Sequence, residues 1–180
     1  MGNPLALSIG PGHLKLAASL STPEPTDLVA AWNAGWIDLG YTEEGSEISV
    51  ETTFEDIEVA EELDPVDVLA TKRVVMISFS LAEITASNLK RVFNGGTITA
   101  ASGCVYYDPV TLGQETYVMI GWESDAADER WIFRKCRQTG NVEIPRKKAP
   151  DKALLPAEFR AIKPPSLPVF RAIEVSPGRA

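Results

Sequence analysis

The chain has 180 residues, of which 44% are hydrophobic and 23% are charged, so it fits one globular domain with enough length to bury a core. Its apolar runs are only a few residues long, far short of the roughly 20 that a membrane-spanning helix needs. The N-terminus has neither the positive start nor the apolar core of a signal peptide, so we expect no membrane association and synthesis in a cytoplasm. Two cysteines, Cys104 and Cys136, are too few for a disulfide framework and are expected to be reduced, buried thiols.

The formal net charge of −8 hides a strong asymmetry along the chain. Residues 1–70 contain fourteen acidic residues and a single base, Lys15, whereas residues 71–180 contain sixteen bases and eleven acids. Two interpretations stay open at this point. The charges lie on ordinary solvated faces, or the protomer has two unlike poles that favour head-to-tail contact between copies.

The first part of the chain predicts an N-terminal arm over residues 1–12 and a strand over residues 13–17. The prolines between residues 21 and 27 predict a loop, because proline lacks a backbone donor and disfavours a helix before it. His13, the only histidine, stands beside a Gly-Pro-Gly turn and is expected to be a strand-edge residue rather than a ligand or base.

The clearest strand pattern lies between residues 36 and 59. Residues 36–41 alternate with period two, a turn follows at residues 42–45, and residues 47–55 alternate apolar and acidic side chains. The apolar phase then moves to Ile57 and Val59, which predicts a β-bulge at Glu55–Asp56.

An acidic loop tip is expected at residues 61–67, followed by a return strand over residues 74–81. Ser80 and Glu83 have the spacing of a capping box, which predicts a helix with Ser80 as its N-cap. The helix is expected to be short and amphipathic, to lie on a sheet, and to end at Gly95–Gly96.

The remainder of the chain predicts short strands separated by turns, including a hairpin turn at residues 139–141. The expected strands cover residues 97–100, 104–107, 115–122, 130–137, 157–162 and 169–175. Together with one helix, this pattern indicates a mainly β protein, either a β-sandwich or a partly open barrel, with a long projecting hairpin loop.

No motif for catalysis, phosphate binding, zinc or calcium is present, so we expect no enzyme, no catalytic or metal-binding residues and no cofactor. Two other function classes stay open. One is a monomeric β-barrel that binds a small ligand between Trp36, Trp122 and Trp131, although the tryptophans are expected to be core or interface anchors. The other is a hydrolase that uses a pair of carboxylates from the acidic stretch.

The order of features from residue 36 to residue 93 resembles the major tail tube proteins of long, non-contractile-tailed bacteriophages. The elements that carry the likeness are Trp36–Gly45, a long strand, an acidic excursion, a return strand and the Leu81–Leu89 segment. In looser form the likeness covers residues 10–175. Tube-forming proteins of secretion machines share this architecture.

The resemblance implies a structural virion protein that assembles into stacked hexameric rings and forms the tail tube, a conduit for the genome. The implied partners are other copies of the chain, the tape-measure protein and the tail-tip and terminator proteins, while DNA passes through the lumen without specific binding. The loop that reaches the next ring in this family corresponds to about residues 55–71, and residues 164–180 form a C-terminal strand and tail.

Within this picture the charged residues are given three candidate roles. Glu47, Glu51 and Glu55 share one strand face and are expected to line the lumen, where carboxylates would repel DNA phosphates. The basic run Arg146, Lys147 and Lys148 is a candidate counter-surface for a neighbouring copy. The candidates for the inter-ring loop are Glu58, Glu61, Glu62, Asp64 and Asp67.

Overall fold

A computed structural model describes residues 12–61, 63–146, 148 and 151–174 of the chain. Within them lie ten strands and one short helix. Most of the expected N-terminal arm, residues 1–12, and the end of the expected C-terminal tail fall outside the described residues, as do Glu62 and Lys147. The elements are β1 Gly12–Ala17, β2 Trp36–Asp38, β3 Thr42–Ile57, β4 Asp67–Leu81, α1 Ala86–Val92, β5 Thr97–Ala101, β6 Cys104–Asp108, β7 Val118–Ser124, β8 Glu129–Gln138, β9 Leu155–Ala161 and β10 Phe170–Glu174.

Eight of the strands form one antiparallel sheet in the order β2-β1-β7-β8-β9-β4-β3, with β10 also paired to β8. β9 pairs with the last residues of β8, whereas β10 pairs with the first residues of β8. The sheet therefore divides into two branches along this edge of β8. The two ends of the order, β2 and β3, do not close into a barrel. The expected fold class, a mainly β and partly open structure with one short helix, is confirmed.

The main core lies between the β1-β7-β8 part of the sheet and the β9-β4 part. β4 shows why these residues form a strand: Val75, Ile77, Phe79 and Leu81 are buried, and the residues between them are not. Phe79 stacks on Phe159 of β9 with ring centroids 5.9 Å apart. Strand alternation therefore places one apolar face inside, as the sequence pattern predicts.

The helix begins later than its sequence pattern predicts. Ser80 is not its N-cap, because Ser80 is extended in β4 and pairs with Pro156 of β9. Thr85 takes this role and its side chain accepts a hydrogen bond from the Asn88 backbone amide at 3.1 Å. Pairing of Ser80 with β9 in the sheet outweighs its local preference for capping a helix.

A second, smaller core on the other face of the sheet is covered by the connection between β1 and β2, residues 18–35. Trp36 is buried there, and Trp32 lies so close to Gly121 that an added Cβ would sit 2.5 Å from the indole ring. Two buried arginines of β8 fix this connection in place. Arg134 donates to both carboxylate oxygens of Glu24, at 2.6 and 3.0 Å, and Arg130 donates to the carbonyl oxygens of Asp27 and Ala30, at 2.6 and 2.8 Å.

Two further expectations are wrong. Residues 139–141 do not form a tight hairpin turn, because the Thr139 and Gly140 amides donate to the Glu158 carbonyl and β9 begins only at Leu155. Cys104 is exposed rather than buried, because it begins β6 at the end of an arm outside the core, whereas Cys136 is buried as expected.

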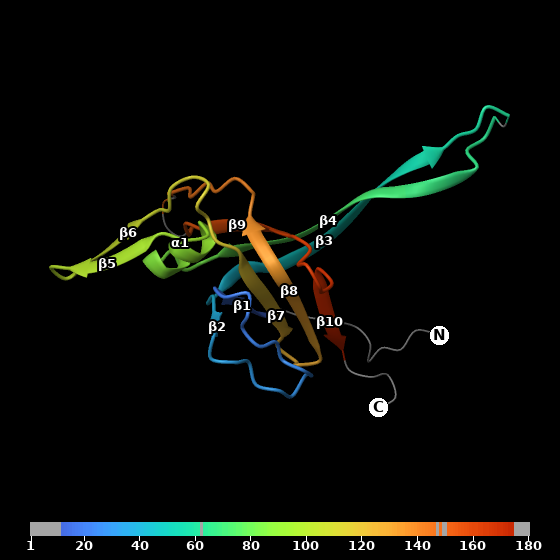
Figure 1. Cartoon of the computed structure of the whole chain (residues 1–180). Coiled ribbons are helices and arrows are strands. Elements are labelled where there is room, and N and C mark those ends of the chain that lie inside the picture. The colour runs from blue at the N-terminus through green and yellow to red at the C-terminus, as the bar shows by residue number, and fades with distance from the viewer. Residues whose placement is uncertain (1–11, 62, 147, 149–150, 175–180) are drawn as a thin grey trace.

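Two hairpins leave the body of the molecule in different directions (Figure 1). The far half of the β3–β4 hairpin projects on one side, and the separate two-stranded β5–β6 sheet projects near α1 on the other. In the described part of the chain, no helix is long and apolar enough to cross a membrane.

Candidate functional site

The projecting half of the β3–β4 hairpin, which we call the ribbon, consists of residues 51–74. β9 pairs with β4 only from Leu81 back to Val75, so beyond that point β3 and β4 pair only with each other. Their pairing continues to Ile57 and Asp67, and the Val66 amide donates to the Ile57 carbonyl at 2.9 Å to close the end. An isolated two-stranded hairpin is marginally stable in water, so a ribbon of this length calls for a further contact.

The ribbon exposes large apolar side chains on both of its faces. Phe54 is 60% exposed and, by strand alternation, shares a face with Val68, while Ile57 and Leu69 lie on the other face. Leu63 at the end of the ribbon is fully exposed. Soluble monomers rarely expose contiguous apolar surface of this kind, so the ribbon has the character of an interaction surface.

The same ribbon is strongly acidic. Glu55, Glu58, Glu61, Asp64 and Asp67 are all exposed, and none of these five forms an ion pair with another described residue. The only basic residues on the ribbon are Lys72 and Arg73, which pair with Thr53 and Thr52 where the ribbon leaves the body of the molecule. The outer end of the ribbon is therefore both apolar and negatively charged.

A bulge in the ribbon lies on β4 and not at Glu55–Asp56 as expected. Thr53 pairs with Lys72 and Phe54 pairs with Ala70, which leaves Thr71 as the extra residue. Glu55 and Asp56 pair with Leu69 and Val68 without interruption. The apolar residues after Phe54 thus do not reflect a phase slip: alternation continues and puts Ile57 on the face of Glu55.

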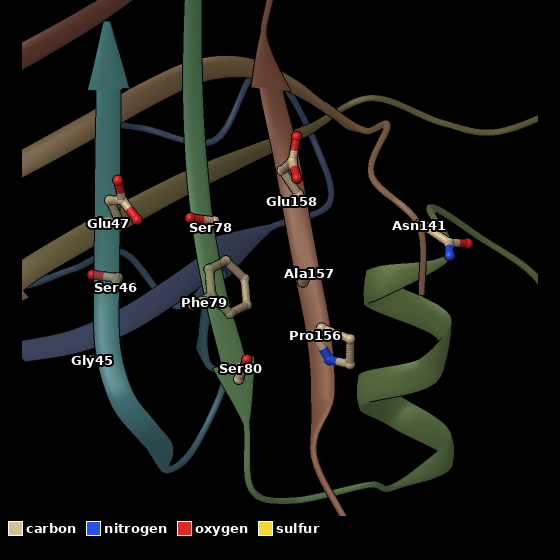
Figure 2. A pocket seen from close by; sticks show the side chains of 10 residues that line it. All are labelled: Gly45, Ser46, Glu47, Ser78, Phe79, Ser80, Asn141, Pro156, Ala157 and Glu158. Carbon is tan, nitrogen blue, oxygen red and sulfur yellow. The ribbon is translucent and has the colours of Figure 1, made fainter. Parts of the chain in front are cut away.

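The outer face of β3, β4 and β9 is polar and carries acids from two distant parts of the chain. Glu47 pairs with Ser78, and Ser78 pairs with Glu158 of β9, so the three side chains form one row across the strands (Figure 2). This row borders a pocket of about 300 Å³. Arg160, two residues after Glu158 in β9, lies on the same face and pairs with Met76 of β4.

The three expected lumen acids do not lie in one environment. Glu47 and Glu51 belong to the outer face, and Glu51 pairs with Val74 just past the last residue that β9 covers. Glu55 lies on the ribbon, beyond the bulge. Sequence reasoning missed Glu158, since alternation in β9 puts it on a polar face but does not reveal that β9 pairs with β4.

The basic run at residues 146–148 lies in the connection between β8 and β9, where Arg146 and Lys148 are exposed. Lys152 of the same connection forms an ion pair with Glu43 at the start of β3. The ribbon acids lie at the opposite end of β3, so the fold does not bring the two candidate charged surfaces together within one protomer.

The three tryptophans of the ligand-binding hypothesis do not share a site. Trp36 packs in the second core, whereas Trp122 and Trp131 pack against the main core, so the three indoles lie on different faces of the sheet. Among the described residues, no group of three or more His, Cys, Asp or Glu side chains is arranged to hold a metal ion. His13 is exposed in β1, with Nε2 3.2 Å from a carboxylate oxygen of Asp125.

Comparison with known proteins identifies the family of the chain. A family model described as phage tail tube protein matches residues 7–175, nearly the whole chain. No curated protein matches the sequence. Because the family match covers far more than half of its length, the chain belongs to the phage tail tube protein family.

Proposed function

We propose that the chain assembles into hexameric rings, that the rings stack head to tail into the tail tube, and that the ribbon carries the contact between rings. The observation that supports this most directly is the ribbon itself. It extends beyond the last strand that could support it and exposes Phe54, Leu63 and Leu69 to solvent. Burial of these side chains against another copy would remove apolar surface that the protomer alone leaves in water.

The open edge of β3 supports a second contact, between neighbours within a ring. β3 is a long edge strand of 16 residues, and unpaired edge strands are templates for pairing with another chain. Pairing along this edge would join the sheets of neighbouring copies around a central channel. The genome and the tape-measure protein would pass through that channel, and tail-tip and terminator proteins would bound its ends.

We propose that the outer face carrying Glu47 and Glu51 faces this channel, with Glu158 as an additional lining acid. Carboxylates repel DNA phosphates, and binding would require cations that displace counterions. Glu55 lies farther along β3, on the ribbon, where it would meet the lumen near the junction of two rings. Arg146, Lys147 and Lys148 remain the proposed counter-surface for acids of a neighbouring copy.

Assembly is tested by electron microscopy of the purified chain together with light scattering over a range of concentrations. We expect rings or tubes with a central hole. A particle that stays monomeric at high concentration, even after a tail-tip complex is added as initiator, would contradict the proposal.

The role of the ribbon is tested by replacing residues 58–66 with Asn-Gly, a two-residue turn that can close the Ile57–Asp67 pair. We expect a folded protomer that forms rings but no tubes, because loop length has only a slow effect on closure entropy. Tubes of normal length from this variant would refute the role of the ribbon.

The channel assignment is tested with the triple variant Glu47→Gln, Glu51→Gln and Glu55→Gln. Tubes should still form, whereas infection per assembled particle should fall because DNA passage is impaired. A control variant with Asp108→Asn and Glu174→Gln removes exposed acids from other surfaces and should infect normally. Equal infectivity of the triple variant and this control would reject the assignment.

A further inference from the structure

A groove that the functions above do not use lies beside α1, between that helix and strands β1, β5 and β7. We call it the α1 groove. Its volume is about 220 Å³, far more than the roughly 30 Å³ share of one water molecule. Leu16 and Val118 form buried parts of its wall, and Ile37 and Ile98 are exposed at it. The α1 groove is thus large and apolar enough to take a side chain from another molecule.

One residue of the groove wall carries a buried polar atom. Asn94 is only 3% exposed, and its Oδ1 atom has no hydrogen-bond partner among the residues that the structure describes. The residue is held firmly by its backbone, because the Asn94 carbonyl accepts from the Thr116 amide at 2.8 Å and from the Thr116 hydroxyl at 3.1 Å. Asn94 is thus a fixed part of the groove wall, and its side-chain oxygen is buried within that wall.

Two cations border the α1 groove without a counter-charge. Lys90 and Arg91 line it, and among the described residues neither forms an ion pair with a carboxylate. The Arg91 guanidinium donates to the Asn88 side-chain oxygen at 2.8 Å, and its burial lowers the pKa of the guanidinium from the ordinary value. A partly buried cation of this kind is stabilised by a carboxylate from outside the protomer.

The end of the ribbon offers the complementary chemistry. The ribbon tip, residues 58–66, carries the fully exposed Leu63 together with Glu61 and Asp64. It thus combines an apolar side chain with acids. It projects on the side of the molecule away from α1 (Figure 1). Complementary surfaces at opposite ends of one chain produce open, repeating stacks rather than closed dimers.

We propose that the α1 groove receives the ribbon tip of a second copy in the next ring of the tube. Leu63 fills the apolar part, and Glu61 and Asp64 meet Lys90 and Arg91. This inference rests on the proposed stacking of rings and names the surface at which the stacking contact forms.

The first test reverses charge on each side of the contact. Lys90→Glu should raise the concentration needed for tube growth on the order of tenfold, since charged hydrogen bonds are among the stronger ones. Adding Glu61→Lys or Asp64→Lys singly to the same chain should restore growth in at least one case, because one reversed residue then meets the new Glu at position 90 while the remaining acid still meets Arg91. Lys163→Glu, which reverses another exposed lysine, is the matched control and should form tubes normally.

Two results of the charge test would overturn the inference. One is tube growth by Lys90→Glu equal to that of Lys163→Glu, and the other is failure of both single tip reversals to restore growth. Because the unmodified chain forms tubes in both cases, ring stacking itself would survive either result. If the unmodified chain forms neither rings nor tubes, the proposed function fails and this inference fails with it.

The second test locates the neighbour by cross-linking. Copies carrying Leu63→Cys are mixed with copies carrying Ser87→Cys at the α1 groove, both in a Cys104→Ser background that removes the exposed native thiol. A short bis-maleimide should join the two in tubes but not in isolated rings. A cross-link in isolated rings would assign the contact to neighbours within a ring. Absence of the cross-link in tubes would mean that the tip does not occupy the α1 groove. Either result overturns the proposal.

Discussion

Two phenylalanines on the same sheet should respond oppositely to the same substitution. Phe54 on the ribbon is 60% exposed, whereas Phe159 of β9 is 0% exposed and stacks on Phe79. We expect Phe54→Ala to leave the protomer as stable as before and to weaken assembly. Phe159→Ala should destabilise the protomer itself, because it leaves a cavity in the main core.

The magnitudes follow from the exposed fractions. Full burial of a phenylalanine contributes about 1.5–3 kcal/mol, so covering the exposed 60% of Phe54 corresponds to about 1–2 kcal/mol per protomer. Loss of this contribution in Phe54→Ala should raise the concentration needed for tube growth by a factor of about 5–30. The free energy of unfolding of the Phe54→Ala protomer should change by no more than about 0.5 kcal/mol, whereas Phe159→Ala should lose about 3–5 kcal/mol.

Urea unfolding, followed by tryptophan fluorescence on dilute protomers, gives the free energies, and pelleting over a concentration series gives the threshold for tubes. The reasoning would be refuted by a loss above about 1 kcal/mol in the Phe54→Ala protomer. It would also be refuted by an unchanged threshold, since the exposed ribbon would then have no partner in the tube.

Three further predictions concern the protomer. Arg134→Met should lower the free energy of unfolding by about 3–5 kcal/mol in urea titrations, because it leaves the partly buried Glu24 carboxylate without its bidentate partner; a loss below about 1 kcal/mol would mean that the pair does not hold the 18–35 connection. In the unassembled native protein a thiol reagent should titrate only Cys104, because burial raises the pKa of the Cys136 thiol to about 12, and both thiols should react in urea; two reactive thiols without urea would contradict the described core. The Ala30 and Val29 amides donate to the Asp27 carboxylate and lower the pKa of this carboxyl. The carboxylate therefore stabilises the fold above the pKa that Asp27 has in the unfolded chain, and this stabilisation is lost as the pH falls through its lower pKa in the folded chain. Asp27→Asn should reduce the loss of stability in acid, and an unchanged acid profile would exclude this role.

Local pattern was enough to predict most of the strands and the character of the ribbon, because alternation depends only on neighbouring residues. The β4 residues Val75, Ile77, Phe79 and Leu81 are buried as their spacing predicts. Pairing order was not readable, and this hid both the row from Glu47 to Glu158 and the separation of Trp36 from the other indoles.

The errors arose where long-range contacts outweighed a local signal. Ser80 has a good capping sequence, but pairing with β9 keeps it extended and moves the helix start to Thr85. The sequence pattern makes no prediction for the side chains of Arg130 and Arg134, which the 18–35 connection buries. The α1 groove could not be predicted at all, because its walls come from elements that only the fold brings together.

The charge asymmetry of the sequence gains a physical explanation from the placement of β3. In the body of the molecule this strand turns its apolar face to the core and its acids outward, while the ribbon exposes both kinds of side chain. Among the described residues, the acids of the ribbon tip form no ion pair with a base, and the cations of the α1 groove form none with an acid. Each imbalance is costly in a lone protomer and is relieved when one copy meets the next. Because the unmatched charges of opposite sign lie at opposite ends of the protomer, they favour head-to-tail stacking of copies in one direction over closed pairs of copies.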